Sequence, residues 1–220
     1  MQQSRLRRPR TTFAALALLA AAAWLTPLAA HAGAQVEERL APSVVTGLSR
    51  AVADNPVPRH YIERPSVREW LAATSPKLAT RFPDELARTE FLATVHYEAT
   101  RAGLDPQLVL GVIHHESNFR KYAISSADAR GFMQVMPFWV RLIGTADQNL
   151  FQLHTNLRYG CTILRHYLDI EHGDLYRALG RYNGSLGQPE YPTAVMAAMK
   201  RYQSDTSVAA VQTSARVSAH

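Results

Sequence analysis

The chain has 220 residues, of which 47% are hydrophobic, and it carries a formal net charge of +6 with a single cysteine. That length suits one domain with an appendage, and one thiol excludes an internal disulfide framework. Four arginines and no acidic residue fall within the first 32 positions, so the remainder holds 20 basic and 18 acidic residues, a charge of +2. So small an excess excludes the basic footprint of a nucleic-acid-binding domain.

The first 32 residues have the pattern of a secretory signal peptide. Basic residues at positions 5–10 precede an alanine-rich apolar stretch over 13–28 and the small-residue sequence Ala30-His31-Ala32. The apolar stretch is sixteen residues long and is interrupted by Pro27, which is short for a span of about 20 residues. We therefore expect cleavage after Ala32, a periplasmic location and no stable membrane span after cleavage.

The rest of the chain predicts a mostly α protein without a period-2 strand. A short amphipathic helix is expected over 33–53 and an extended, proline-punctuated linker over 55–65. Further helices are expected over 67–73, 84–102, 106–120, 133–142, 156–171, 174–182 and 192–203. This divides the chain into a signal peptide (1–32), a helical and proline-rich extension (33–83), a main helical domain (84–203) and a disordered tail (204–220).

Glu116 lies at the end of an apolar helical run, where a structural helix would carry another hydrophobic residue. On a helical wheel Val109, Val112 and Ile113 lie within about 60° of it, so its carboxylate points inward. Desolvation and the dipole at the helix C-terminus both raise its pKa, as a general acid at neutral pH requires. The alternative is a carboxylate at the edge of the core that is paired with Arg120, four residues on.

The stretch after this helix reads HESNFRKYAISSADARGFMQVMP from His115 and is rich in polar and turn-forming residues. A loop of this composition can fold back over the helix end and bring an amide, a hydroxyl and thioethers to the carboxylate. Such a mixture of groups suits a sugar.

At this point the chain resembles the catalytic domain of the soluble lytic transglycosylase (SLT) family, a branch of the lysozyme-like superfamily. The family pattern is Glu-Ser, a Ser nine residues after the Glu, and then Gly-Leu-Met-Gln-x-Met-Pro. Glu116-Ser117, Ser125 and residues 131–137 match it in order and spacing, and residues 181–183 stand where the family has Ala-Tyr-Asn. The resemblance implies a lysozyme-like helical fold, a catalytic domain over 84–203 and lytic transglycosylase activity on peptidoglycan glycan strands.

The resemblance also implies residue roles. Glu116 would act as the single acid/base that protonates the glycosidic oxygen of the MurNAc-GlcNAc bond and then takes the proton of the muramic C6 hydroxyl. The product would be a 1,6-anhydro sugar. The expected substrate-binding residues are Ser125 at the N-acetyl group, Gln134 and Met136 along its subsite, and Tyr182 and Asn183 beside the Glu, with the Tyr182 hydroxyl in contact with it.

Two departures from the family pattern leave alternatives open. Asp128 stands where the family loop usually has Gly, and a second carboxylate near Glu116 could position water for a hydrolytic muramidase; the other interpretation is that Asp128 caps a turn. Arg181 replaces the small residue before Tyr-Asn and either contacts a substrate carboxylate or is solvated. A third alternative is a non-catalytic glycan-binding scaffold, and an envelope or secretion assembly stays open as a further partner.

The sequence indicates no metal and no cofactor. The zincin pattern would need a His three residues after His114-His115-Glu116, and Phe119 stands there. Cys161 shares the apolar phase of its helix, which predicts a core thiol.

Overall fold

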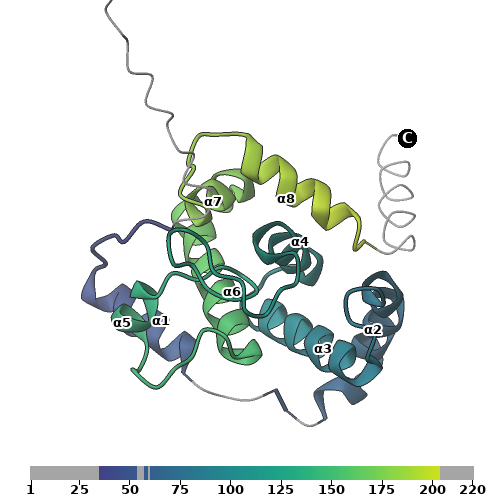
Figure 1. The fold of residues 1–220 in the computed structure, drawn as a ribbon. Helices are drawn as coiled ribbons and strands as arrows, with labels where there is room; N and C mark the ends of the chain where they lie inside the picture. Colours follow the sequence, from purple (N-terminus) through teal and green to yellow (C-terminus); the bar gives the residue numbers. More distant parts are fainter. Residues whose placement is uncertain (1–34, 54–56, 59, 204–220) are drawn as a thin grey trace, which may run out of the picture. The chain divides into compact units, whose positions relative to one another are not determined.

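The computed structural model describes residues 35–53, 57–58 and 60–203 (Figure 1). Within these ranges the chain is helical and contains no β-strand, which confirms the mostly α class. The elements are α1 (Pro42–Val52), the 3-10 helix η1 (Tyr61–Glu63), α2 (Pro65–Leu78), α3 (Glu85–Arg101), α4 (Pro106–Ser117), α5 (Phe138–Ile143), α6 (Leu153–Ile170), α7 (Leu175–Tyr182) and α8 (Glu190–Lys200). The expected signal peptide and C-terminal tail lie outside the described residues.

Several elements differ from the sequence expectations. Residues 61–63, in the linker expected to be extended over 55–65, form the 3-10 helix η1. Residues 35–41 are extended, and the first helix begins only at Pro42. The helix expected over 67–73 runs from Pro65 to Leu78 and includes Pro76, which removes one i→i−4 hydrogen bond two residues before the helix ends. The helix expected over 133–142 is wrong in its first half, because residues 131–135 form turns and bridges and α5 begins at Phe138.

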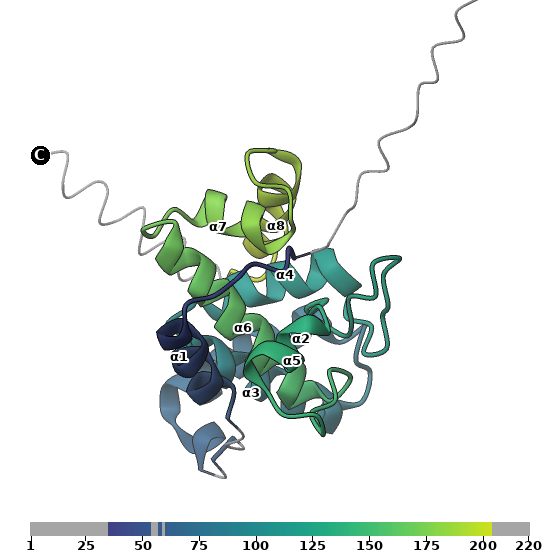
Figure 2. The same cartoon turned by 90° about the vertical axis from the view of Figure 1, so that its left-hand side faces the viewer.

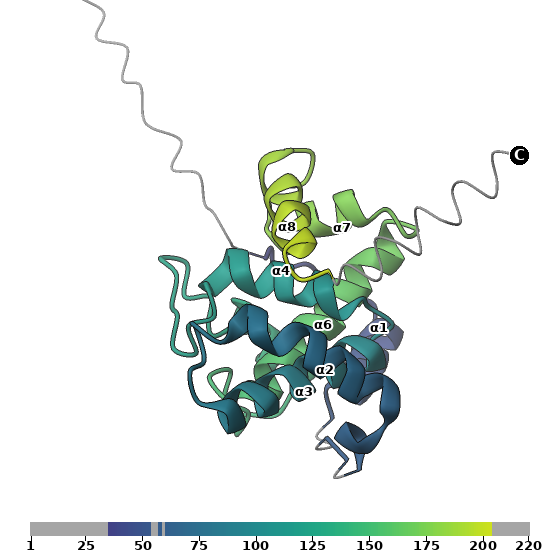
Figure 3. The ribbon, with the colours of Figure 1, turned by 90° about the vertical axis from the view of Figure 1, so that its right-hand side faces the viewer.

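Helix α4 lies at the centre of the core. All five residues of its apolar run over 109–113 are buried. Helix α8 crosses α4 closely, as Figure 3 shows. The close approach depends on Gly111, because a Cβ there would lie 2.8 Å from the Val195 carbonyl oxygen and 2.9 Å from the Met199 nitrogen. Glycine costs about 1 kcal/mol relative to alanine inside a helix, and here it allows two backbones to meet.

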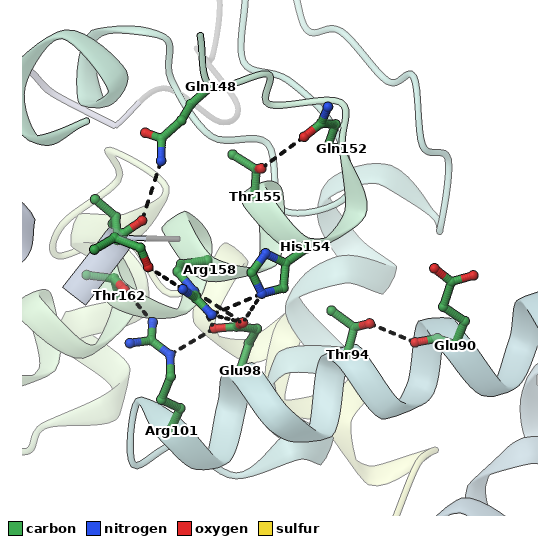
Figure 4. A network of polar contacts seen from close by, with 12 residues as sticks. Glu90, Thr94, Glu98, Arg101, Gln148, Gln152, His154, Thr155, Arg158 and Thr162 are labelled. Atoms are coloured by element: carbon green, nitrogen blue, oxygen red, sulfur yellow. Dashed lines mark hydrogen bonds and ion pairs between the residues drawn. The ribbon is translucent and has the colours of Figure 1, made fainter. Parts of the chain in front are cut away.

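The residues before α3 pack on the same core. Leu48 and Val52 of α1 and Leu78 of α2 are buried in it. A polar network adds to this packing (Figure 4): Arg158 of α6 binds Glu98 of α3 and donates to the main-chain oxygen of Ala53 beside α1. No helix in the described ranges is long and apolar enough to cross a membrane.

Candidate active site

Capping residues fix both ends of helix α4 and so determine where Glu116 lies along it. The Asp105 side chain caps its N-terminus by accepting from the Gln107 amide at 2.8 Å. Its C-terminus stops at Asn118, which has a left-handed φ of 51°, a conformation that asparagine tolerates better than most residues. Glu116 therefore lies in the last turn, and its side chain is partly exposed at one end of an otherwise buried apolar face.

Burial raises the pKa of Glu116 to about 7, and a hydrogen bond from Tyr191 partly opposes this rise. The Tyr191 hydroxyl, on α8, donates to Glu116 Oε1 at 2.5 Å. The Tyr191 ring packs edge-on against His115, with ring centroids 4.8 Å apart. Arg120 does not neutralise the carboxylate, because its Nε donates to the main-chain oxygen of Ser117. At neutral pH Glu116 is thus poised between its acid and its base form, which is the state that proton transfer requires.

Ser125 organises the loop that follows α4. Its hydroxyl oxygen accepts from the amides of Ala127 at 3.2 Å and Ala129 at 3.1 Å. Asp128 sits at the tip with a φ of 66°, and both its carboxylate oxygens pair with Arg130. A left-handed backbone explains why a glycine suits this position, and aspartate is among the residues that tolerate it.

Gln134 holds the turn that carries the rest of the motif. Its side-chain amide donates to the carbonyl oxygens of Ala123 at 3.1 Å and Gly131 at 3.0 Å, and its own φ is 48°. A buried non-glycine residue in this conformation is strained, and such strain clusters at functional sites. The side chain is thus occupied inside the turn, and the main-chain oxygen of Gln134 accepts from the side chain of Gln35 at 3.2 Å.

Asn156, on α6, fastens this turn to the core. Its Oδ1 accepts from the Met133 amide, and its Nδ2 donates to the carbonyl oxygens of Arg130 and Leu150, each at 2.8 Å. One turn further along α6, a Cβ at Gly160 would lie 2.3 Å from the Met133 sulfur. The Asn-x-x-x-Gly spacing therefore serves to seat Met133 against α6.

A family model described as the transglycosylase SLT domain matches residues 93–203, about half of the chain. The chain belongs to the transglycosylase SLT family. The match covers every site residue described above, from Glu116 to Tyr191, and it begins within α3.

Individual relatives match shorter stretches of the chain. The membrane-bound lytic murein transglycosylase C of Mannheimia succiniciproducens is 41% identical over 64 residues, which cover 29% of this chain and 16% of the relative. The protein of that name from Haemophilus influenzae is 43% identical over 69 residues, 31% of this chain and 18% of the relative. A transglycosylase of Enterobacteria phage PRD1 is 33% identical over 98 residues, 44% of this chain and 36% of the relative. The chain thus spans little more than a third of these relatives at most.

Among solved structures, an inactive variant of the lytic transglycosylase Slt from Pseudomonas aeruginosa aligns with 77% of this chain and 35% of its own. The TM-score is 0.42 and the sequence identity is 18%.

The second SLT motif differs from expectation. The Tyr182 hydroxyl does not contact Glu116; it is buried and donates to the main-chain oxygen of Met133 at 2.7 Å. Burial, with a smaller contribution from the charge of Glu116, raises the Tyr182 pKa, so the two side chains are neighbours without a hydrogen bond. Asn183 caps the end of α7 and donates to Ser185 at 3.0 Å. Tyr182 and Asn183 therefore support the site, and Tyr191 supplies the hydroxyl that the sequence assigned to Tyr182.

Arg181 is partly exposed and is paired with two glutamates. Its Nε donates to Glu171, and its Nη1 lies 3.3 Å from an Oε1 of Glu38. Cys161 is a buried free thiol, as the helical phase predicts. Among the residues that the structure describes, no group of three or more His, Cys, Asp or Glu side chains could hold a metal ion.

Sequence reasoning missed two residues at the site. Tyr191 is the aromatic residue of α8, whose sequence is EYPTAVMAAMK, and a phenol there was a weak signal of a polar role. Gln35 lies 99 residues before Gln134 yet is only 4% exposed and hydrogen-bonds to it. No local pattern reveals a contact of such sequence separation.

Proposed function

We propose that this protein is a peptidoglycan lytic transglycosylase in which Glu116 is the single acid/base. The observation that carries the proposal is a carboxyl group with a pKa near 7, desolvated at a helix end and hydrogen-bonded by one phenol, within an SLT domain. The relatives named as lytic murein transglycosylases support the same substrate class.

The first chemical step is proton donation. Tyr191 occupies Oε1 of Glu116, so the proton is carried by Oε2, which is free to approach the glycosidic oxygen. Transfer of this proton lets the bond between the muramic C1 and the glycosidic oxygen break, and positive charge develops on the sugar ring. The hydrogen bond from Tyr191 stabilises the carboxylate that is left behind.

The second step closes the anhydro ring. The Glu116 carboxylate removes the proton of the C6 hydroxyl, and the C6 oxygen bonds to C1 of the same muramic residue. The enzyme regains its proton and no water is consumed. One carboxylate is sufficient because the substrate supplies its own nucleophile, and this matches a site in which burial and Tyr191 set the pKa of Glu116.

The muramic residue would be held by Ser125, Met136 and the main chain of Gln134, with Tyr182 and Asn183 behind them. The Ser125 oxygen already accepts two amides within its loop, which leaves its proton to donate to the N-acetyl carbonyl. In this proposal Gln134 binds through its backbone, since its side chain is used inside the turn.

A hydrolytic muramidase with Asp128 as a second carboxylate is the less favoured function. Asp128 is exposed at the loop tip and paired with Arg130, and it is not among the groups that shift the Glu116 pKa. A base that activates water should instead face the acid across the scissile bond.

Mass spectrometry of muropeptides released from purified peptidoglycan tests the proposal. The expected products carry 1,6-anhydro-muramic ends. The Glu116→Gln protein should release them far more slowly than the unmodified protein. Reducing muramic ends would establish hydrolysis, and binding without release by the unmodified protein would establish a glycan-binding scaffold.

The proposed location is the periplasm, reached through the signal peptide over 1–32. The word "membrane-bound" in the names of two relatives supports a place in the cell envelope. A protein that opens the wall locally could serve an envelope or secretion assembly, and we include such an assembly as a proposed partner beside the glycan strands.

A further inference from the structure

The extended segment over residues 35–40, here called the N-terminal strap, runs from α1 toward α4 and α8 (Figure 2). Its first residue, Gln35, is 4% exposed, whereas the next, Val36, is 58% exposed. Leu40, at the other end of the strap, packs against the core, but the tip buries a polar side chain and exposes an apolar one, so the hydrophobic effect does not hold the tip. It is held by what the polar side chain binds.

The Gln35 carboxamide bridges the motif that follows Ser125. Its Nε2 donates to the main-chain oxygen of Gln134 at 3.2 Å, and its Oε1 accepts from the main-chain nitrogen of Met136 at 3.1 Å. A single amide group therefore satisfies one acceptor and one donor, two residues apart, on the same stretch of backbone. The Gln35 side chain also hydrogen-bonds Tyr182, which lowers the Tyr182 pKa, whereas the charge of Glu116 raises it, so Tyr182 is a shared neighbour of the carboxamide and the proposed acid.

Besides the packing of Leu40 against the core, the strap has two further attachments, and both are ion pairs. Glu37 pairs with Arg141 at 3.5 Å, and Glu38 pairs with Arg181 at 3.3 Å. Both glutamates are about half exposed, and ion pairs of this kind contribute little to stability. Residues 35–39 can therefore detach without unfolding α1, because Leu40 and, within α1, Leu48 and Val52 stay packed on the core.

A peptidoglycan sugar offers the same chemistry as Gln35. Each sugar carries an acetamido group, whose N–H donates and whose C=O accepts, as the two ends of a carboxamide do. A glycan that used the Gln134 oxygen and the Met136 amide would need the atoms that Gln35 now occupies, and the two cannot bind together.

We propose that the N-terminal strap is a built-in substrate mimic, in which Gln35 occupies the acetamido-binding backbone groups of Gln134 and Met136 and must leave before a glycan binds. The inference rests on the proposed function, because it takes the substrate class from it. Free protein would then be held in a closed state, and its apparent affinity for glycan would be reduced by the fraction that is closed.

The test is the affinity for tri-N-acetylchitotriose, measured by calorimetry in the Glu116→Gln protein so that no cleavage occurs. Gln35→Ala should bind the trisaccharide about five- to tenfold more tightly, because the competing carboxamide is gone. Val36→Ala is the matched control on the same strap, and it should leave the affinity unchanged. Gln35→Glu retains the length of the side chain but opposes the Gln134 oxygen with a second oxygen, so it should also tighten binding.

Unchanged or weaker affinity in both Gln35 variants, with melting temperatures like that of the Val36→Ala protein, would overturn the proposal and make the strap a fixed wall of the site. If one variant fails to fold, the other decides. The proposed function fails separately, when the unmodified protein gives no anhydro products from peptidoglycan, and the trisaccharide comparison still reports on the strap. An active protein whose KM for peptidoglycan falls in Gln35→Ala at unchanged kcat would support the mimic.

Discussion

Two glutamates on neighbouring helices have pKa values shifted in opposite directions, and one suits a structural ion pair whereas the other suits proton transfer. Glu98 on α3 is fully buried, and although burial raises its pKa, hydrogen bonds from His154 and Arg158 and the charges of Arg158 and Arg101 lower it to about 2. Glu116 on α4 has a pKa near 7, because burial is opposed only by one neutral phenol. Both side chains are glutamates on the inner side of a helix, so the groups that each carboxylate contacts determine the difference in pKa.

The partners come from other helices. Arg158 and His154 lie one turn apart on α6, so both reach Glu98, at 2.8 Å and 3.0 Å. Glu116 receives its partner from α8, which supplies a hydroxyl and no positive charge. A permanently ionised carboxylate can hold helices together, whereas one that titrates near neutral pH can exchange a proton with a substrate.

The largest expected effect is on catalysis. Glu116→Gln keeps the shape of the side chain but removes the exchangeable proton, so the rate of peptidoglycan release should fall by about 10² to 10⁴. Turbidity loss of a peptidoglycan suspension measures the rate, and circular dichroism should show an unchanged helical signal. Release near the unmodified rate would remove Glu116 from the mechanism.

Glu98→Gln should produce the opposite pattern. The substitution removes the Glu98 charge from the network around Arg158, which is only 2% exposed, and breaking a buried ion pair costs about 3–5 kcal/mol. Urea unfolding should show this loss, while the folded fraction should retain near-normal activity. Equal stability of the two proteins would mean that the network in Figure 4 contributes no net stability.

Stability should also depend on pH in opposite directions for the two residues. The folded pKa of Glu98 lies below its ordinary 4.5, so its contribution is present above about pH 4.5 and is lost as the pH falls toward 2. The folded pKa of Glu116 lies above 4.5, so its ionisation costs stability as the pH rises from about 4.5 to 7. Urea midpoints at pH 3, 5 and 8 should show Glu116→Gln to be relatively more stable at pH 8 and Glu98→Gln to lose its acid dependence.

Tyr191→Phe should sharpen the assignment of the titrating group. The Tyr191 hydroxyl lowers the Glu116 pKa, so its removal should move the basic limb of the kcat/KM profile to higher pH, by about one pH unit for a hydrogen bond to a charged group. Activity falls above the limb because the free enzyme must begin protonated.

Tyr182→Phe is the control, because that hydroxyl serves the Met133 carbonyl. Its limb should stay in place even if the substitution lowers stability. If the basic limb shifts in Tyr182→Phe and not in Tyr191→Phe, then Tyr182, the residue that the sequence motif favours, is the one that contacts Glu116.

Local patterns explain what the sequence could predict. The phase of one apolar run placed Glu116 against Val109 and Val112 and gave the direction of its pKa, because both depend on a single helix. The helix boundary at 133 was missed because an apolar run reads as helical, while the structure bends it with a left-handed Gln134 and fastens it with Asn156. The side chain that stabilises this turn, Asn156, lies too far along the sequence for a local pattern to include it.

Contacts between elements far apart in the sequence were out of reach for the same reason. Tyr191 meets Glu116 only because Gly111 lets α8 approach α4. The Gln35 contact depends on a segment that the sequence assigned to an amphipathic helix. In both cases tertiary packing brings the two residues together, and no spacing in the sequence predicts the contact.

The smallest expected effect concerns the second carboxylate. Asp128→Asn should change the rate of peptidoglycan release less than about twofold, because a surface pair such as Asp128 with Arg130 contributes at most about 1 kcal/mol. Asp128→Gly should be tolerated equally well, since φ at this position is 66° and glycine adopts it without strain. The measurement is the release rate together with the ratio of anhydro to reducing muramic ends. A rate that collapses in both variants, with reducing ends from the unmodified protein, would mean that Asp128 activates water and that two carboxylates share the reaction.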